Sequence, residues 1–93
     1  LGAIGSEQAA VVVVRALGDA EAIVRQAAAR AIGELGHWDG ALALAAQLAD
    51  TSFPVRREAA LSLRRLGSVG VLVLRRARTD ANPFVADMAS QVL

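Results

Sequence analysis

General acid–base chemistry needs a histidine or a carboxylate with a partner within hydrogen-bond reach, and this 93-residue chain has one histidine, His37. His37 stands beside Trp38, and Asp39 is the nearest acidic residue. Asp39 also suits the cap of a helix that begins at Gly40, because its side chain can accept a hydrogen bond from a first-turn amide. We therefore interpret these residues as a turn between helices and predict no catalytic residue.

Sites for a metal ion, a cofactor or a nucleotide phosphate have no signature in the sequence. The chain contains no cysteine, which removes thiolate ligands and disulfide bonds. No P-loop, glycine-rich dinucleotide motif or metal-ligand spacing occurs in it. The sequence thus predicts a protein that is not an enzyme and that needs neither a cofactor nor a metal.

The basic residues are concentrated in one segment. All ten of them are arginine, and seven lie in residues 56–78 beside a single acid, Glu58, so that this segment carries a charge of +6 in a chain of net charge +1. Such a segment is either the solvated surface of helices or a site for an acidic partner, including nucleic acid phosphates. The weak net charge and the lack of aromatic residues between the arginines disfavour nucleic acid, and we favour the solvated surface.

An internal repeat of 31 residues determines which elements position these side chains. Residues 19–36 align with residues 50–67, and residues 1–5 align with residues 32–36, at the same offset. A further copy begins at Asp80 at an offset of 30, because one residue is missing near Gly70. The identical pairs in the first alignment are Asp19, Val24, Arg25, Ala28, Ala29, Leu35 and Gly36 with Asp50, Val55, Arg56, Ala59, Ala60, Leu66 and Gly67. Repetition at this period is typical of stacked helix hairpins.

The spacing of apolar residues predicts two helices in each repeat. In the first helix, one face collects Val24, Ala28, Ala31 and Leu35, and in the second helix it collects Ala41, Leu44, Ala45 and Leu48. The valines at 11–14 alone would favour a strand, but they align with the helical residues 42–45. We predict six helices, at about 6–18, 22–35, 39–49, 53–66, 70–78 and 83–93.

Capping residues mark the ends of these helices. Ser52 and Asn82 are suited to the N-cap position, and Pro83 follows at the first helical position, where its missing amide hydrogen costs nothing. Gly36 and Gly67 stand where helices commonly end on a glycine.

The repeat resembles a known family. The pattern Asp-x4-Val-Arg-x2-Ala-Ala-x2-Leu-x2-Leu-Gly, complete from Asp50 to Gly67, closely resembles the bacterial HEAT-like repeats named after phycobilisome lyases. This resemblance implies an all-α fold, a right-handed α-solenoid of stacked antiparallel helix pairs whose second helices line the inner surface. Relatives serve as scaffolds, as docking platforms and as subunits of chromophore lyases. A bacterial scaffold is thus the main expectation, and a chromophore-lyase subunit is an alternative from the resemblance alone.

The same resemblance implies a structural ladder between repeats. Arg25 and Arg56 occupy the position of the arginine that usually pairs with the turn aspartate of a neighbouring repeat, here Asp19 or Asp50. Ala86 stands at this position in the third copy, so the ladder is expected to end there.

The second helices carry the residues that we predict to bind a partner. Their outward positions are Val12 with Arg15, Ala43 with Ala46 and Val73 with Arg76, and the boundary positions are Val11, Leu42 and Leu72. A solvated helix face is ordinarily polar, and contiguous exposed apolar surface usually marks an interaction site. We predict a protein or peptide partner on Val12, Arg15, Leu42, Ala43, Leu72, Val73 and Arg76, with the arginines meeting acidic residues. The alternative is that other parts of the same polypeptide cover this surface.

Two further expectations concern the fifth helix and the ends of the chain. Arg75 and Arg78 stand at positions equivalent to Ala45 and Leu48, so the fifth helix is expected either to be rotated or to fray. The chain divides into a partial repeat at 1–18, repeats at 19–49 and 50–79, and a partial repeat at 80–93, as a segment of a longer solenoid. Because polar capping repeats are missing, self-association through the ends is expected. No apolar run approaches the roughly 20 residues of a membrane span, and no targeting signal is visible, which favours the cytoplasm.

Overall fold

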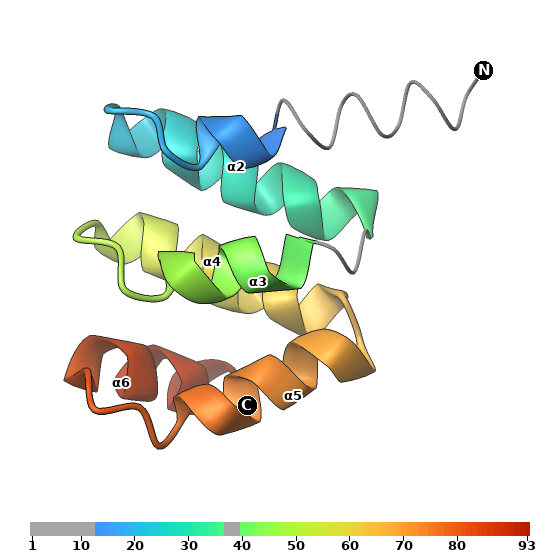
Figure 1. Ribbon diagram of the computed structural model, residues 1–93, viewed down its shortest axis with the longest axis vertical. Helices are drawn as coiled ribbons and strands as arrows, with labels where there is room; N and C mark the ends of the chain where they lie inside the picture. Colours follow the sequence, from blue (N-terminus) through green and yellow to red (C-terminus); the bar gives the residue numbers. More distant parts are fainter. Residues whose placement is uncertain (1–12, 37–39) are drawn as a thin grey trace.

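The computed structural model describes residues 13–36 and 40–93, and these residues are helical apart from their connecting turns (Figure 1). The helices are α2 (Ala22–Leu35), α3 (Gly40–Gln47), α4 (Phe53–Arg65), α5 (Ser68–Ala77) and α6 (Pro83–Val92), and residues 13–16 are helical as well. The predicted bounds of these five helices agree with the observed ones to within two residues. The predicted helical state of Val13 and Val14 is confirmed, whereas residues 6–12 of the predicted first helix lie outside the described residues.

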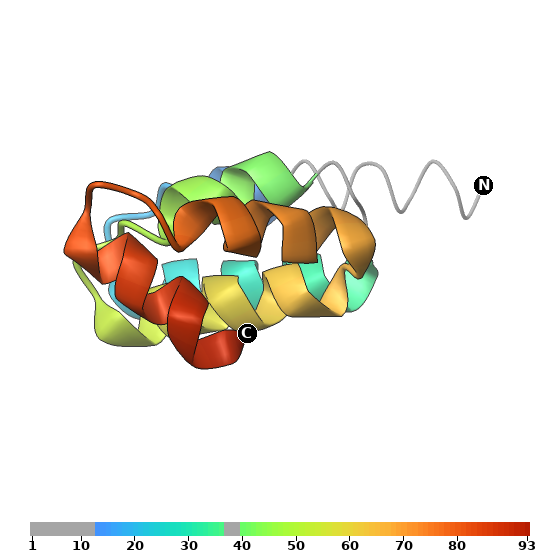
Figure 2. The ribbon, with the colours of Figure 1, turned by 90° about the horizontal axis from the view of Figure 1, so that it is seen from below.

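The helices form two layers. α2, α4 and α6 stack in one layer, and α3 and α5 stack with residues 13–16 in the other, as Figures 1 and 2 show. Within each repeat the second helix runs antiparallel to the first. The all-α fold and the stacking of antiparallel helix pairs are therefore confirmed, and no strand occurs in the described part of the chain. In the same residues, no helix is long and apolar enough to cross a membrane.

One cluster of buried apolar side chains joins the layers. Leu44 and Leu48 of the second helices and Leu63 of α4 are at most 1% exposed. Burial of each such leucine contributes about 1.5–3 kcal/mol relative to an exposed side chain. The other members of the cluster are Leu17, Ala28, Ala29, Ile32, Ala41, Ala59, Ala60, Leu74, Ala77, Val85, Met88 and Ala89. Seven of these are alanines, whose small side chains let neighbouring helices approach closely.

The first helices α2 and α4 approach each other closely at Gly33. A Cβ atom at this position would stand 2.9 Å from the Cα atom of Ser62, so α2 and α4 fit together because residue 33 has no side chain. Ser62 is fully buried, and its Oγ donates a 2.7 Å hydrogen bond to the carbonyl oxygen of Ala29. This bond satisfies a hydroxyl that would otherwise be costly to bury.

The helix ends follow the capping prediction, with one exception. Gly36 and Gly67 both have a positive φ, 68° and 81°, which confirms them as helix-terminating glycines. The Asn82 side chain accepts a hydrogen bond from the amide of Phe84, so it is a true N-cap. Ser52 occupies the N-cap position of α4, but its side chain makes no cap hydrogen bond. Its amide instead donates to Asp50 Oδ1 at 2.8 Å.

The predicted apolar face of the first helix is buried in α4 but only partly in α2. Val55 and Ser62 are fully buried, whereas the equivalent positions in α2 are partly open, with Val24 at 36% exposure. Leu35 is 41% exposed, and Ala28 alone of its predicted stripe is buried. The apolar stripe of α2 is therefore only partly buried. α2 covers the corresponding face of α4, whereas the only described helices that contact α2 are α4 and α3.

Candidate partner-binding surface

The outer face of the second helices exposes large apolar side chains at equivalent positions. Leu42 in α3 is 81% exposed, and Leu72, which lies 30 residues later in α5, is 59% exposed. Val14, at the described end of the preceding second helix, is 41% exposed, and Ala46 is exposed on the next turn of α3 after Leu42. We refer to Val14, Leu42, Ala46 and Leu72 as the apolar strip.

The composition of the apolar strip corrects the predicted orientation of the second helices. Ala43 and Val73, predicted to point outward, are half-buried and pack against the core cluster. Leu42 and Leu72, predicted to lie at the boundary, are the exposed residues. On a helix of 3.6 residues per turn, Leu42 and Ala43 flank the buried stripe at similar angles. Which flank is covered depends on the neighbouring helices and not on the spacing within one helix. Val12 lies outside the described residues.

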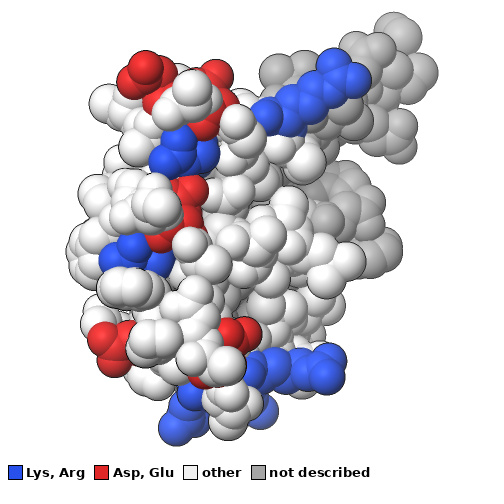
Figure 3. Space-filling model, turned by 60° about the vertical axis from the view of Figure 1, so that its left-hand side comes forward, with Lys and Arg blue, Asp and Glu red and all other residues white. Residues whose placement is uncertain are grey.

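Basic side chains accompany the apolar strip at its two ends. Arg15 and Arg76 are exposed, as predicted, while α3 between them contains no charged residue. Figure 3 shows a broad uncharged area in the right half of the view, between basic side chains near its top and its bottom. The arrangement can therefore offer apolar contact at its centre and positive charge at its ends.

The fifth helix does not fray at its arginines. α5 continues to Ala77, which is buried together with Leu74, while Arg75 and Arg78 are exposed. Leu74 is buried like its equivalent Leu44, but Ala77 is buried at the end of α5, whereas Leu48, the equivalent of the exposed Arg78, is buried after α3. Of the two expectations for this helix, the structure supports a rotation, which shifts the buried side of its last turn.

Arg25 makes hydrogen bonds to two turns, the one before α2 and the one before α4. Its Nε donates to Asp50 Oδ2 at 2.9 Å and its Nη2 to Asp50 Oδ1 at 3.2 Å, which makes the bidentate pair expected from the ladder. Its Nη1 donates to the carbonyl oxygens of Asp19 and Ala20. In Figure 3 the turns form a column of alternating acidic and basic side chains on the left of the view.

Arg56 makes different contacts from its equivalent, Arg25. Its Nη1 donates to the carbonyl oxygen of Asp50 at 2.7 Å, but its guanidinium group lies 4.8 Å from the centre of the Phe84 ring and 5.7 Å from that of Phe53. These distances are those of cation–π contacts. Among the described residues, the ladder between repeats therefore has one arginine–aspartate pair, Arg25 with Asp50. At the next junction Arg56 contacts the rings of Phe53 and Phe84 instead.

The Arg25–Asp50 pair makes stability depend on pH. Burial raises the pKa of Asp50, but hydrogen bonds from Arg25 and from the Ser52 amide outweigh it and bring this pKa below the ordinary value of 3.8. The pKa of Asp50 is therefore lower in the folded state than in the unfolded state. The stabilisation that this pair gives to the fold is fully present when the pH is above the unfolded-state pKa, and it is lost as the pH falls through the folded-state pKa. We expect the free energy of unfolding to fall more steeply with acid in the wild type than in an Asp50→Asn variant.

Urea unfolding followed by circular dichroism between roughly pH 6 and pH 2 measures this difference. The Arg25→Gln variant should show the same flattened acid dependence, because it removes the side-chain partner of Asp50. Parallel pH dependences in all three proteins would contradict the role of this pair.

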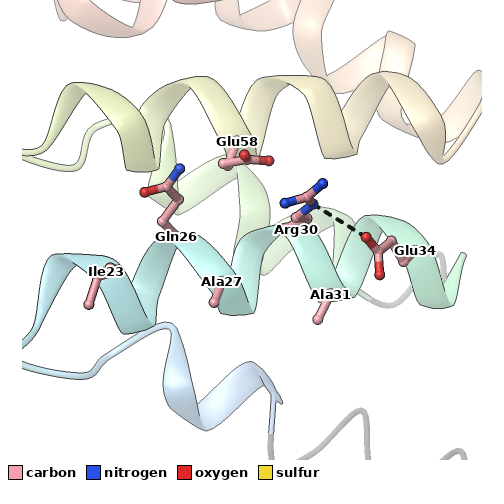
Figure 4. A pocket seen from close by; sticks show the side chains of 7 residues that line it. All are labelled: Ile23, Gln26, Ala27, Arg30, Ala31, Glu34 and Glu58. Atoms are coloured by element: carbon pink, nitrogen blue, oxygen red, sulfur yellow. Dashed lines mark ion pairs between the residues drawn. The ribbon is translucent and has the colours of Figure 1, made fainter.

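The opposite layer carries an open groove between α2 and α4. It has a volume of about 320 Å³ and is lined by Ile23, Gln26, Ala27, Arg30, Ala31, Glu34 and Glu58 (Figure 4). Its ion pair, Arg30 with Glu34 at 3.4 Å, is highly exposed on both sides and is therefore expected to contribute little stability. Specific ligand sites are usually enclosed and hold a few precisely placed polar groups, so we assign no ligand to this groove.

Two comparisons with known proteins complete the description. A sequence model of HEAT repeats matches residues 10–93. No curated protein matches the chain. The matched range includes every described helix and both predicted full repeats, so the resemblance inferred from the pattern between Asp50 and Gly67 is confirmed.

Proposed function

Because the chain belongs to the HEAT-repeat family, whose repeats generally serve as scaffolds for protein interactions, we propose that it binds a protein or peptide partner on its apolar strip. The observation that carries this proposal is the high exposure of Leu42 and Leu72 at equivalent positions of neighbouring helices. Covering a leucine side chain contributes about 1.5–3 kcal/mol. A partner that covers both leucines therefore gains a substantial part of its affinity from them.

The spacing of the apolar strip suits a helical partner. Neighbouring packed helices lie about 8–10 Å apart, and seven residues of a helix span about 10 Å. A partner helix that crosses α3 and α5 can thus place two apolar residues, seven positions apart, against Leu42 and Leu72. Acidic residues beyond these anchors would meet Arg15 and Arg76, which gives the partner a defined orientation.

The arginines of residues 56–78 support a nucleic acid partner less well. Arg64 and Arg65 lie at the end of α4, and Arg75 and Arg76 lie at the end of α5. Because the two helices run antiparallel in different layers, these pairs are at opposite ends of the hairpin (Figures 1 and 2). A phosphate backbone is usually followed by a continuous basic groove or face. We therefore keep a protein or peptide as the proposed partner.

Selection of peptides from a random library on the immobilised full chain tests this proposal. We expect the selected peptides to be rich in Asp and Glu and to share apolar residues seven positions apart, because such peptides fit the apolar strip and its arginines. Their binding should weaken moderately with added salt, since exposed charges are screened. Selected peptides that are mainly basic, or that share no apolar spacing, would contradict the proposal.

A further inference from the structure

Two exposed hydroxyl groups lie on the same face of α5 as Leu72, the exposed leucine of the apolar strip. Ser68 begins α5, four residues before Leu72, and Thr79 follows its last turn, seven residues after Leu72. Residues four and seven positions apart share one face of a helix, and the backbone is still helical at Arg78, with φ −59° and ψ −27°. The face of α5 that we propose to bind a partner is therefore bounded by a hydroxyl group at each end.

The two hydroxyl groups follow the same arrangement of arginines. Residues 64–68 and residues 75–79 both have the pattern Arg-Arg-x-x-Ser or Arg-Arg-x-x-Thr. All four of these paired arginines are exposed. Protein kinases discriminate between substrates by their charge pattern, and one class of kinases selects arginine a few positions before the acceptor hydroxyl. Each hydroxyl therefore stands in the charge pattern of a phosphorylation site.

The local structure favours Thr79 over Ser68 as the acceptor. A kinase has to hold the acceptor residue in its own active site, so the acceptor must lie in a segment that can move away from its surroundings. Ser68 lies within α5, directly after the tight turn of residues 66–67. Thr79 lies in the longer connection of residues 78–82, which loops out at the lower left of Figure 1. Its hydroxyl group donates to the carbonyl oxygen of Arg76 at 3.1 Å, on the exposed surface.

A phosphate on Thr79 would lie beside the arginines at the basic end of the apolar strip. Residues three and four positions apart are neighbours on a helix surface, which places Arg75 and Arg76 next to Thr79. A phosphate group carries a charge of about −1.5 to −2, and arginine binds its oxygens in bidentate geometry. Residues 75–80 contain three arginines and one aspartate, so the phosphate would change the charge of this segment from +2 to about zero.

We propose that Thr79 is a phosphorylation site of an arginine-selective protein kinase, and that its phosphate weakens the binding of an acidic partner to the apolar strip. In the reaction, Thr79 Oγ1 forms a bond to the γ-phosphorus of ATP, the bond from this phosphorus to the ADP oxygen breaks, and the hydroxyl proton passes to the kinase. The phosphate then occupies the guanidinium groups that acidic residues of the partner would meet. The effect on binding rests on the proposed function, whereas the phosphorylation does not.

The phosphorylation is tested by incubating the full chain with a kinase that selects arginine three residues before its acceptor, together with ATP and Mg²⁺, and by locating the phosphate with mass spectrometry. We expect phosphate on Thr79, and at least about tenfold slower modification in the Arg75→Gln/Arg76→Gln variant. Thr51 is the matched control, because it is also exposed in a turn between repeats but follows an aspartate. Faster modification of Thr51 or Ser68 than of Thr79, or an unchanged rate in the paired variant, would overturn the proposal.

The effect on binding is tested by fluorescence anisotropy with an acidic peptide selected on the unmodified chain. We expect the chain phosphorylated at Thr79 to bind this peptide roughly threefold to tenfold more weakly, because exposed ion pairs each contribute little. This difference should shrink with added salt, since the charges are exposed. The Thr79→Val variant, treated with the same kinase, should bind like the unmodified wild type, which shows that loss of the hydroxyl alone has no effect.

Equal affinity of the phosphorylated and the unmodified chain would overturn the regulation while the proposed function stands. An unmodified chain that binds no acidic peptide would overturn the proposed function and the regulation together. In that case the mass spectrometry still decides whether Thr79 is a phosphorylation site.

Discussion

Replacing Gly70 with alanine is expected to lower the free energy of unfolding by about 3 kcal/mol or more, because the new methyl group would overlap the carbonyl group of Leu63. Gly70 is buried in the first turn of α5, and the overlapped atoms belong to the backbone of α4. A backbone carbonyl cannot rotate away as a side chain can. The two helices would have to separate, which exposes Leu63 and Leu74, both fully buried. A domain of this size has a total stability of only about 5–15 kcal/mol.

Urea unfolding followed by circular dichroism measures this loss, and Gly18 provides the matched control. An alanine Cβ at Gly18 would lie 3.6 Å from the carbonyl oxygen of Arg15, an ordinary van der Waals distance. Gly18 is exposed and does not have a positive φ, so Gly18→Ala should change stability by less than about 0.5 kcal/mol. Equal stability of the two variants would contradict the described contact between α4 and α5.

The helices and their order could be predicted from the sequence because the apolar and helix-terminating residues recur in successive repeats. In the alignment of residues 19–36 with residues 50–67, the apolar residues Val24, Ala28 and Leu35 recur as Val55, Ala59 and Leu66. Gly36, Gly67 and Asn82 act through local backbone geometry, so residue type and position were sufficient to predict their roles. The pairing of Arg25 with Asp50 also followed from the pattern of the repeat, through its resemblance to a known family.

The details that could not be predicted depend on contacts between helices that are distant in sequence. Leu42 and Ala43 differ in exposure because neighbouring helices cover one flank of α3 and not the other. Arg56 lies over Phe84, a residue of the next repeat, although its own position in the repeat is the same as that of Arg25. Val24 is exposed because burial on this face depends on another helix, whatever the periodicity of α2 itself.

The paired substitution Leu42→Asp with Leu72→Asp is expected to weaken the binding of a selected acidic peptide by roughly 100-fold or more. Loss of two leucine contacts of about 1.5 kcal/mol each already corresponds to about 100-fold, since 1.4 kcal/mol is a tenfold change in affinity. Two new carboxylates would in addition repel the acidic partner. Because both leucines are largely exposed, the helical content measured by circular dichroism should stay unchanged.

The most direct test of binding at the apolar strip is a fluorescence anisotropy titration of that peptide against three proteins, the wild type, the Leu42→Asp/Leu72→Asp variant and an Ile23→Asp variant. Ile23 is 75% exposed and belongs to the opposite layer, so it controls for the general effect of an aspartate at an exposed apolar position. We predict that the Ile23→Asp variant binds like the wild type while the paired variant loses the peptide. Wild-type affinity in the paired variant, or an equal loss in the Ile23→Asp variant, would contradict binding at this surface.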